Sequence, residues 1–363
     1  MTRLIVIGPL PPPYHGVTIS TELVLANEDV RNRFAVEHLD TSDHRPHQNV
    51  GRWDRTNVRL ALGTARILRR MLRGPKGVVY LPVSQSAPGF LRDSLYVDLA
   101  TRCGWKVAVH LRGSDFARFF EQSPRPLRLW IRATLRRVSS VAVMGESLRW
   151  VFDGLVPSER IAVVPNGTPE PHPNGARRDG ETVLFLSNLR RRKGVVEAVE
   201  AARLVLERRP RTRFLFVGEW EDGPLEHALR RRASAADGRI AFMPSVVGQQ
   251  KHDLLASCSV LLFPPTEPEG HPRVVLEALA AGLPVVTTNR GAIAETVVDG
   301  VSGFVLEHPE PEQLSERLLR LLSDEDLRRR MSEAARQRYL ERFTQRRADR
   351  RFADWLAEVA ERS

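Results

Sequence analysis

The sequence predicts an α/β protein with two doubly wound domains that face a cleft. Short apolar segments such as Val260–Phe263 alternate with amphipathic stretches through both halves of the chain, which is typical of parallel sheets covered by helices. A length of 363 residues leaves room for two domains. Residues 168–180 contain three prolines and two glycines, and this composition indicates a hinge.

Apolar runs bounded by glycine, proline or polar residues mark the expected strands. In the first half we expect strands at residues 4–7, 106–110, 141–144 and 160–164. In the second half we expect them at residues 183–186, 214–217, 239–243, 260–263 and 285–288. The N-terminal MTRLIVIGPL has a short apolar core and no small-residue cleavage site, so we interpret it as a first strand and not as a signal peptide.

The composition is that of a soluble globular protein, with 42% apolar and 27% charged residues. No apolar run approaches the roughly 20 residues that span a bilayer. Cys103 and Cys258 are the only cysteines, too few for a disulfide framework, so we expect a cytoplasmic protein. No strand-end Asp-x-Asp pair and no His/Cys cluster has the spacing of metal ligands, so we expect neither a metal nor a cofactor.

The net charge of +11 is concentrated in the first half of the chain. Residues 1–170 carry 24 Lys/Arg against 15 Asp/Glu, whereas residues 171–363 carry 31 against 29. Arginines recur at helical spacing over residues 52–76, among them Arg59, Arg66 and Arg70, and a second basic helix is expected over 125–137. A solvated helix face explains this pattern, and docking on an anionic membrane is the alternative. The stripes lack interleaved aromatic residues, which argues against nucleic acid.

The most informative stretch is PPTEPEGHPRVVLEALAAGLPVV, residues 264–286. It predicts a strand, a tight loop, a helix from about Arg273 to Ala281 and a further strand. The N-terminus of such a helix can hold an anion, and the carboxylates of Glu269 and Glu277 can each accept hydrogen bonds from neighbouring hydroxyls. A phosphate and vicinal diols together describe a nucleotide sugar. The alternative is a pair of glutamates that only favour a helix N-terminus.

The segment EGHPRVVLEALAAGLPVVTTNRGAIAETVVDGVSGFVL, which starts at Glu269, closely resembles the donor-binding half of family-4 glycosyltransferases. These are retaining enzymes of the GT-B fold, with two Rossmann-like domains. The resemblance implies an acceptor-side domain over residues 1–168, a hinge over 169–181, a donor domain over 182–345 and a last helix over 346–363 that returns to the first domain. It places Glu269 on the sugar and Glu277 on the ribose.

Other donor contacts also follow from the resemblance. Leu189, Lys193 and Gly194 match the family pattern whose lysine neutralises the diphosphate, but Asn188 stands where the family has arginine, and Arg190, Arg191 or Arg192 are candidates to compensate. His271 stands where an aromatic residue is frequent, and we expect its amide and those of Gly270 and Arg273 to contact oxyanions. Gly218 and Val246 are expected to approach the nucleotide.

Three places in the first domain also resemble the family. His110 ends the strand at 106–110, where ligands of doubly wound sheets bind, and the family commonly has a histidine near the sugar; a histidine buried in a core is the alternative. Gly16 closes a loop that resembles the family's first glycine loop, although a rigid turn explains it equally well. Arg112 and Asp115 are candidates for acceptor contact.

We therefore expect a retaining, metal-independent glycosyltransferase. It would move a sugar from a UDP- or GDP-sugar to a glycan or lipid-linked acceptor, by attack on the face that the leaving phosphate vacates. Cell-envelope or extracellular polysaccharide synthesis is the expected setting, in the cytoplasm or peripherally on the inner face of the cell membrane. A sugar-nucleotide epimerase of the same fold and a non-catalytic nucleotide-sugar-binding protein are the alternatives.

Overall fold

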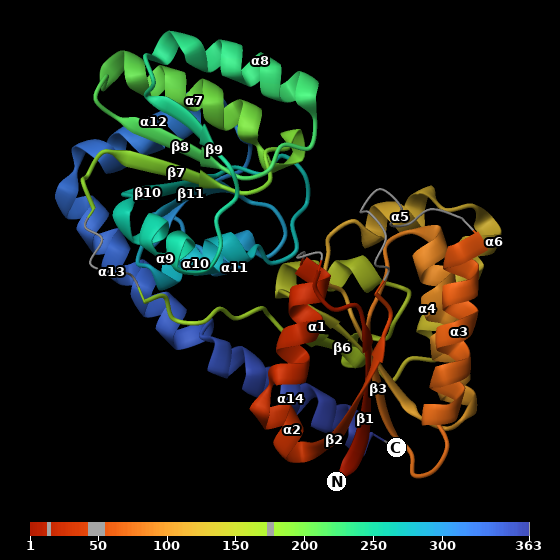
Figure 1. Cartoon of the computed structure of the whole chain (residues 1–363). Helices are drawn as coiled ribbons and strands as arrows, with labels where there is room; N and C mark the ends of the chain where they lie inside the picture. Colours follow the sequence, from red (N-terminus) through yellow and green to blue (C-terminus); the bar gives the residue numbers. More distant parts are fainter. Residues whose placement is uncertain (13–15, 43–54, 173–177, 363) are drawn as a thin grey trace. The chain divides into compact units, whose positions relative to one another are not determined.

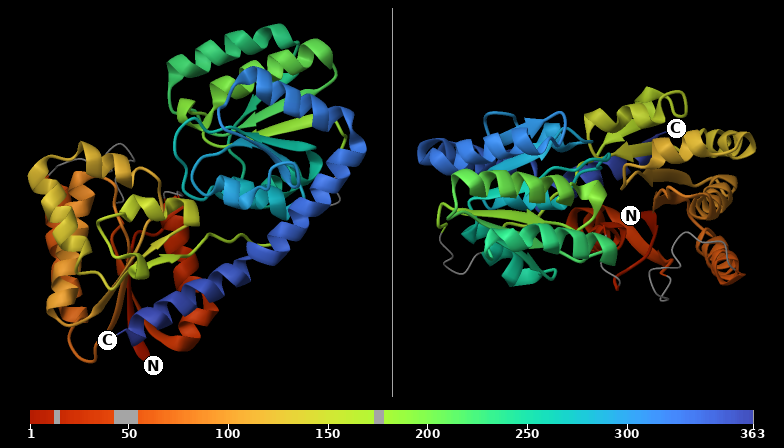
Figure 2. Two further views of the ribbon diagram at one scale, coloured as in Figure 1. Left: turned by 180° about the vertical axis from the view of Figure 1, so that it is seen from behind. Right: turned by 90° about the horizontal axis from the view of Figure 1, so that it is seen from above.

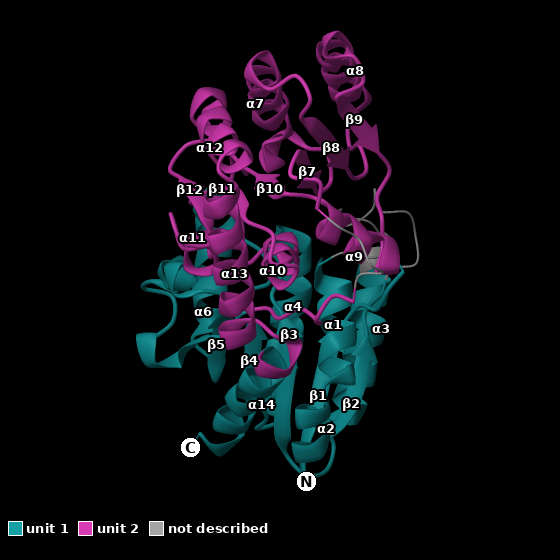
Figure 3. Cartoon of the chain, turned by 90° about the vertical axis from the view of Figure 1, so that its left-hand side faces the viewer, with its two compact units in different colours: residues 1–165, 348–363 teal, residues 166–347 magenta. Residues whose placement is uncertain are grey.

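The computed structural model describes residues 1–12, 16–42, 55–172 and 178–362. The chain folds into two compact units (Figure 3). Unit 1 contains residues 1–165 and 348–363, and unit 2 contains residues 166–347. The chain therefore passes between the units twice, once after Pro165 and once after Arg347.

Unit 1 is built on a parallel sheet of six strands in the order β2-β1-β3-β4-β5-β6 (Figure 1). Its strands are β1 (Thr2–Gly8), β2 (Phe34–Asp40), β3 (Gly77–Pro82), β4 (Lys106–His110), β5 (Ser140–Val143) and β6 (Ile161–Val163). Its helices are α1 (Gly16–Ala26), α2 (Glu28–Arg33), α3 (Arg55–Met71), α4 (Ala87–Arg102), α5 (Phe116–Gln122), α6 (Arg125–Leu135), the 3-10 helices η2 (Glu146–Phe152) and η3 (Ser158–Arg160), and most of α14 (Gln345–Glu361).

Helices cover both faces of this sheet. Val24 of α1 and Val30 of α2 share a buried cluster with Phe352, Trp355 and other residues of α14. Helices α3, α4 and α6 lie side by side on the opposite face (Figures 1 and 2). The C-terminal helix therefore completes the core of unit 1.

Unit 2 repeats the architecture with six parallel strands in the order β12-β11-β10-β7-β8-β9. The strands are β7 (Thr182–Leu186), β8 (Arg213–Val217), β9 (Ile240–Met243), β10 (Val260–Phe263), β11 (Val285–Thr288) and β12 (Gly303–Leu306). The helices are η4 (Arg191–Lys193), α7 (Val195–Arg208), α8 (Gly223–Ala233), η5 (Ser234–Ala236), α9 (Gly248–Ser257), α10 (Arg273–Ala280), α11 (Ile293–Thr296), α12 (Pro311–Ser323) and α13 (Glu325–Arg342). One apolar cluster joins the sheet to α7, α8 and α12, and another joins it to α9, α10, α11 and α13.

The two doubly wound α/β sheets confirm the predicted fold class. The structure shortens some expected elements. The basic helix expected over residues 52–76 is α3, which ends at Met71 before Gly74 adopts a φ of 93°, and residues 52–54 lie outside the described part. The helix expected after residue 144 is the 3-10 helix η2. Among the helices of the described residues, none combines the length and apolar character needed to cross a bilayer.

Ligands of doubly wound sheets bind beyond the carboxyl ends of the strands. In unit 2, β7 and the adjacent β10 run parallel, so the segments that follow them leave from the same edge. These segments are residues 187–194, which include Lys193, and residues 264–272, which include Glu269. The second of them is called the donor loop below.

Candidate functional site

The donor loop is held at both ends by backbone contacts. Near its start, the amide of Thr266 donates a hydrogen bond to the carbonyl of Arg192 at 3.2 Å. Near its end, the amide of Ala292 donates to the carbonyl of Gly270 at 2.9 Å. Gly291 has a φ of 58°, and a Cβ at this position would lie 1.6 Å from the carbonyl oxygen of Glu269. Glycine is therefore required for the approach that fixes the loop.

Lys193 and Glu269 form an ion pair, with 2.5 Å between Nζ and Oε1. The pair is largely buried, since the side chain of Glu269 is 9% exposed and that of Lys193 is 21% exposed. The ammonium group also lies 5.8 Å from the ring centroid of Phe263, the last residue of β10. Gly194 makes this geometry accessible, because a Cβ there would lie 1.8 Å from the carbonyl oxygen of Pro264. The turn over residues 191–194 can thus rest directly on the end of β10.

Glu277, one turn into α10, has a cationic partner as well. Its Oε1 lies 2.7 Å from Nζ of Lys251 on α9, and both side chains are partly buried. Lys251 was not predicted from the sequence, because a single lysine on a helix gives no signal of its own. Each predicted donor carboxylate therefore carries a lysine partner in the free protein.

The segment that bears the predicted diphosphate contacts is positioned by β8. A Cβ on Gly218 would lie 1.9 Å from the carbonyl oxygen of Ser187, so the turn after β8 packs closely on the segment that follows β7. Asn188 is exposed on this segment. Arg190, a candidate to replace the missing arginine, forms an ion pair with Glu221 at 2.8 Å. In this conformation the guanidinium of Arg190 is therefore engaged by an acid, while Lys193 is paired with Glu269.

The side chain of His271 is buried and makes hydrogen bonds within unit 2. Its Nδ1 accepts a hydrogen bond from the amide of Asn166 at 3.0 Å, and its Nε2 lies 2.9 Å from Oγ1 of Thr296. Burial lowers the pKa of His271 to about 3, with smaller opposed effects of Glu295 and Arg273. Ligand contact through the amide of His271 was predicted from the sequence, whereas these side-chain bonds were not. Val246 is half-buried in the segment after β9.

His110 occupies an aromatic environment in unit 1. It is fully buried, and its ring stacks on Phe352 with centroids 6.2 Å apart and meets the edges of Tyr80 and Trp355. Burial, followed by the charge of Arg112, lowers the pKa of His110 well below its usual value, more than the backbone of Val164 raises it. The burial is that of the core histidine considered above, but Nδ1 and Nε2 lack a hydrogen-bond partner among the described residues, so the ring is not a satisfied core histidine. Contact with a sugar stays a prediction.

Asp115, one of the two candidates for acceptor contact, lines a shallow cavity of about 420 Å³ in unit 1. The backbone amide of Asp115 donates a hydrogen bond to Oε1 of Gln85 at 2.6 Å. Arg112 donates a hydrogen bond to the hydroxyl of Tyr80 at 3.2 Å. Gly16 is the first residue of α1, and residues 13–15 of its loop lie outside the described part. The roles of these residues stay predictions.

Residues 168–338 match the family model described as glycosyl transferases group 1. Phosphatidyl-myo-inositol mannosyltransferase of Mycolicibacterium smegmatis is 28% identical over 198 residues, which cover 53% of this chain and 50% of that protein. N-acetyl-alpha-D-glucosaminyl L-malate synthase of Bacillus anthracis is 30% identical over 172 residues, covering 47% and 43%. The chain thus spans about half the length of the curated relatives it matches.

The similarity of fold extends over the whole chain. The crystal structure of HepE from Anabaena in complex with UDP and glucose aligns with a TM-score of 0.76 at 16% identity, covering 99% of this chain and 100% of that one. This likeness and the two parallel sheets show the GT-B fold. The match to the glycosyl transferases group 1 family model lies in residues 168–338, which make up most of unit 2.

Proposed function

We propose that the protein transfers a sugar from a UDP- or GDP-sugar to a glycan or lipid-linked acceptor with retention at the anomeric carbon. The observation that carries this proposal is the pairing of Lys193 with Glu269 beside the donor loop, at the carboxyl edge of the second sheet. The second pair, Lys251 and Glu277, supports it. The family match and the UDP in the related HepE crystal support a nucleotide-sugar donor.

Both ion pairs provide groups that a nucleotide sugar can use. A diphosphate would give Lys193 an anionic partner in place of Glu269, and sugar hydroxyls would donate to the released carboxylate. Ribose hydroxyls would likewise donate to Glu277. Lys193 and Glu269 then each exchange one partner for another, which avoids leaving either charge unpaired, and an unpaired buried charge would strongly oppose binding.

Charge develops on the diphosphate as the glycosidic bond breaks, and a cation placed there stabilises the transition state. Lys193 would supply this cation. The acceptor hydroxyl would attack the anomeric carbon from the face of the departing phosphate, whose oxygen takes the hydroxyl proton. The products are the glycosylated acceptor, with the new bond on that same face, and a nucleoside diphosphate. Because Lys193 supplies the positive charge, we expect no requirement for a divalent metal.

Asn188 and Arg190 leave little positive charge for a diphosphate besides Lys193, which bears on a second candidate function. Asn188 is neutral, and Arg190 is engaged by Glu221, so neutralisation of the diphosphate rests more heavily on Lys193 than in the family pattern. This observation favours a non-catalytic nucleotide-sugar-binding protein as the alternative. A sugar-nucleotide epimerase would instead convert the donor with no acceptor present.

A thermal-shift screen against UDP, GDP, ADP and their common sugars tests the proposal. We expect one nucleotide sugar to raise the melting temperature selectively, with and without EDTA. Incubation of that sugar with extracts of envelope glycans or glycolipids should then release the nucleoside diphosphate. Binding without release in any extract would favour the non-catalytic alternative, and conversion of the donor without an acceptor would favour the epimerase.

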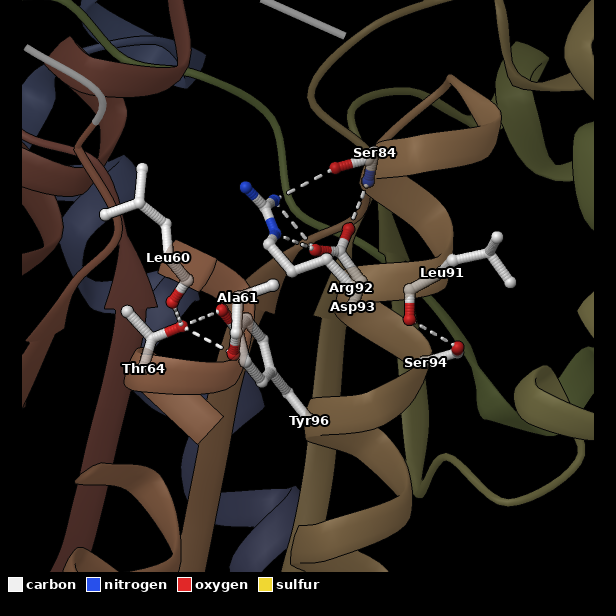
Figure 4. A network of polar contacts seen from close by, with 9 residues as sticks. All are labelled: Leu60, Ala61, Thr64, Ser84, Leu91, Arg92, Asp93, Ser94 and Tyr96. Atoms are coloured by element: carbon white, nitrogen blue, oxygen red, sulfur yellow. Dashed lines mark hydrogen bonds and ion pairs between the residues drawn. The ribbon is translucent and has the colours of Figure 1, made fainter. Parts of the chain in front are cut away.

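A membrane-bound acceptor fits the outer side of the helical layer of unit 1. Polar contacts tie its helices together. Thr64 of α3 forms a hydrogen bond with the hydroxyl of Tyr96 of α4 (Figure 4), and Trp130 of α6 donates to Ser94 of α4 at 2.9 Å. The exposed faces of α3 and α6 combine arginines with large apolar side chains. The exposed apolar residues include Val58, Leu60, Leu62, Ile67, Leu129 and Trp130, and the exposed arginines include Arg59, Arg66, Arg70, Arg125, Arg132 and Arg136.

Residues 55–76 and 124–137 contain no acidic residue. We therefore propose that this face binds anionic lipid, where each basic side chain contributes about 1 kcal/mol. Reversal of Arg59, Arg66 and Arg70 to glutamate should release the protein from vesicles with 30% phosphatidylglycerol. Reversal of the exposed Arg208, Arg211 and Arg231 of unit 2 changes the net charge equally and should not. Absence of vesicle binding by the wild-type protein would contradict membrane association.

A further inference from the structure

The side chain of His271 links the donor loop to the point where the chain enters unit 2. Asn166 is the first residue of unit 2. Its amide donates to Nδ1 of His271 at 3.0 Å, and its side-chain Nδ2 donates to the backbone carbonyl of His271 at 2.9 Å. Next to them, Arg273 donates to the carbonyl of Gly167 at 3.1 Å. The end of the donor loop and the start of unit 2 are thus joined by three hydrogen bonds.

The segment by which the chain leaves unit 2 is attached at the same place. The amide of Thr168 donates to the carbonyl of Phe343 at 3.0 Å, and the amide of Gln345 donates to the carbonyl of Thr168 at 3.0 Å. The ring of His271 packs edge-on against Phe343 with centroids 5.4 Å apart. Both connections between the units therefore meet at His271, two residues from Glu269.

The hydrogen-bond network requires one neutral tautomer of His271. The Thr296 hydroxyl donates to the carbonyl of Ala292 at 2.7 Å, so it accepts from Nε2–H of His271, and Nδ1 keeps its lone pair for the amide of Asn166. The amide of Ala292 in turn donates a hydrogen bond to the carbonyl of Gly270. The imidazole thus bridges the entering segment on one side and the support of the donor loop on the other.

We propose that His271 is a positioning residue that couples the donor loop to the two connections between the units. The conformation of these connections, residues 166–168 and 343–345, then sets the affinity for the donor. This inference rests on the proposed function for its consequence, because the loop carries Glu269. It does not require His271 to touch the donor. Phenylalanine or tyrosine at this position could fill the same space, but neither ring could accept a hydrogen bond from the amide of Asn166.

Two substitutions separate the two bonds of the imidazole. In His271→Asn the side-chain oxygen lies near the position of Nδ1, so it can still accept from Asn166, while the bond to Thr296 is lost. In His271→Gln the amide nitrogen lies near the position of Nε2, so it can still donate to Thr296, while the bond to Asn166 is lost. Thr296→Val removes the bond between His271 and Thr296 together with the bond from the Thr296 hydroxyl to Ala292, keeps the bond to Asn166, and serves as a second control.

Hydrogen exchange in the free protein and titration with UDP and GDP provide the readouts. We expect His271→Gln to speed exchange over residues 166–168 and 266–272 and to weaken binding of the preferred nucleotide about 3- to 10-fold, the effect of one lost hydrogen bond. His271→Asn and Thr296→Val should stay within about 2-fold of wild type in binding. Equal exchange and equal affinity in His271→Gln and His271→Asn would overturn the coupling.

Failure of the inference and failure of the proposed function give different results. If wild-type protein binds neither UDP nor GDP, the proposed donor is wrong, and the exchange measurement still tests the coupling by itself. If wild-type protein binds and both variants lose melting temperature and affinity to the same extent, His271 only fills space and the inference is wrong.

Discussion

Replacement of Lys193 by methionine should lower the free energy of unfolding, because it breaks the ion pair of Lys193 and Glu269. Methionine keeps most of the length and apolar volume of the lysine side chain but removes the charge. The carboxylate of Glu269, 9% exposed, would then lack its cation at 2.5 Å. Breaking a buried pair costs about 3–5 kcal/mol. Because Lys193 is 21% exposed and water can reach part of the site, we expect a loss near the lower end, about 3 kcal/mol.

Urea unfolding of the wild type, Lys193→Met, Glu269→Gln, their double variant and Arg329→Met measures this loss. The double variant Lys193→Met, Glu269→Gln removes the unpaired charge as well, so it should recover about 2 kcal/mol relative to the sum of the single variants. Arg329→Met breaks the exposed pair of Arg329 with Asp326 on α13 and should cost less than about 0.5 kcal/mol. A loss below about 1 kcal/mol for Lys193→Met, with no coupling in the double variant, would refute the buried pair.

Three further predictions concern the donor loop and its surroundings. Glu277→Ala should weaken binding of the preferred nucleotide about 10- to 100-fold, since ribose hydroxyls lose a charged acceptor; calorimetry with Glu226→Ala of the exposed pair on α8 as the control checks this. Gly291→Ala should destabilise the protein by at least about 1 kcal/mol more than Gly300→Ala in thermal unfolding, because both have a positive φ but only Gly291 meets backbone atoms within 4 Å. His271 has a pKa of about 3 in the folded protein against about 6.5 unfolded, so the unfolded state binds the extra proton and stability falls as the pH drops from 6.5 towards 3. At pH 5 this loss is about 2 kcal/mol relative to pH 7.5, and urea unfolding of His271→Asn should lack it.

Most strands of both sheets could be predicted because buried parallel strands are short, nearly continuous apolar runs, but β3 and β12 were not expected although both are mostly buried. The expected strands at residues 106–110, 260–263 and 285–288 coincide with β4, β10 and β11. The edge strand β2, with the sequence FAVEHLD, is mostly only half-buried, so it lacks such a run and the sequence analysis did not identify it. Apolar periodicity reports burial, and an edge strand is buried on one side only.

The candidate site was predictable where one local segment contains it. Glu269 and Glu277 lie in one strand–loop–helix unit, whose pattern is visible in the sequence. Lys251 and the partners of His271 could not be found in this way, because Asn166 and Thr296 lie 105 and 25 residues away from His271 along the chain. Side-chain hydrogen bonds between distant segments depend on the packing of the folded unit. They leave no periodic signal in the sequence.

Calorimetric titration of the whole chain with UDP-glucose and GDP-mannose in the presence of EDTA is the most direct test of a metal-independent donor site on unit 2. Wild-type protein should bind one of the two nucleotide sugars. Glu277→Ala and Lys193→Met should each weaken that binding at least about 10-fold. Binding that needs a divalent metal, or binding that neither substitution affects, would contradict the site at Lys193, Glu269 and Glu277.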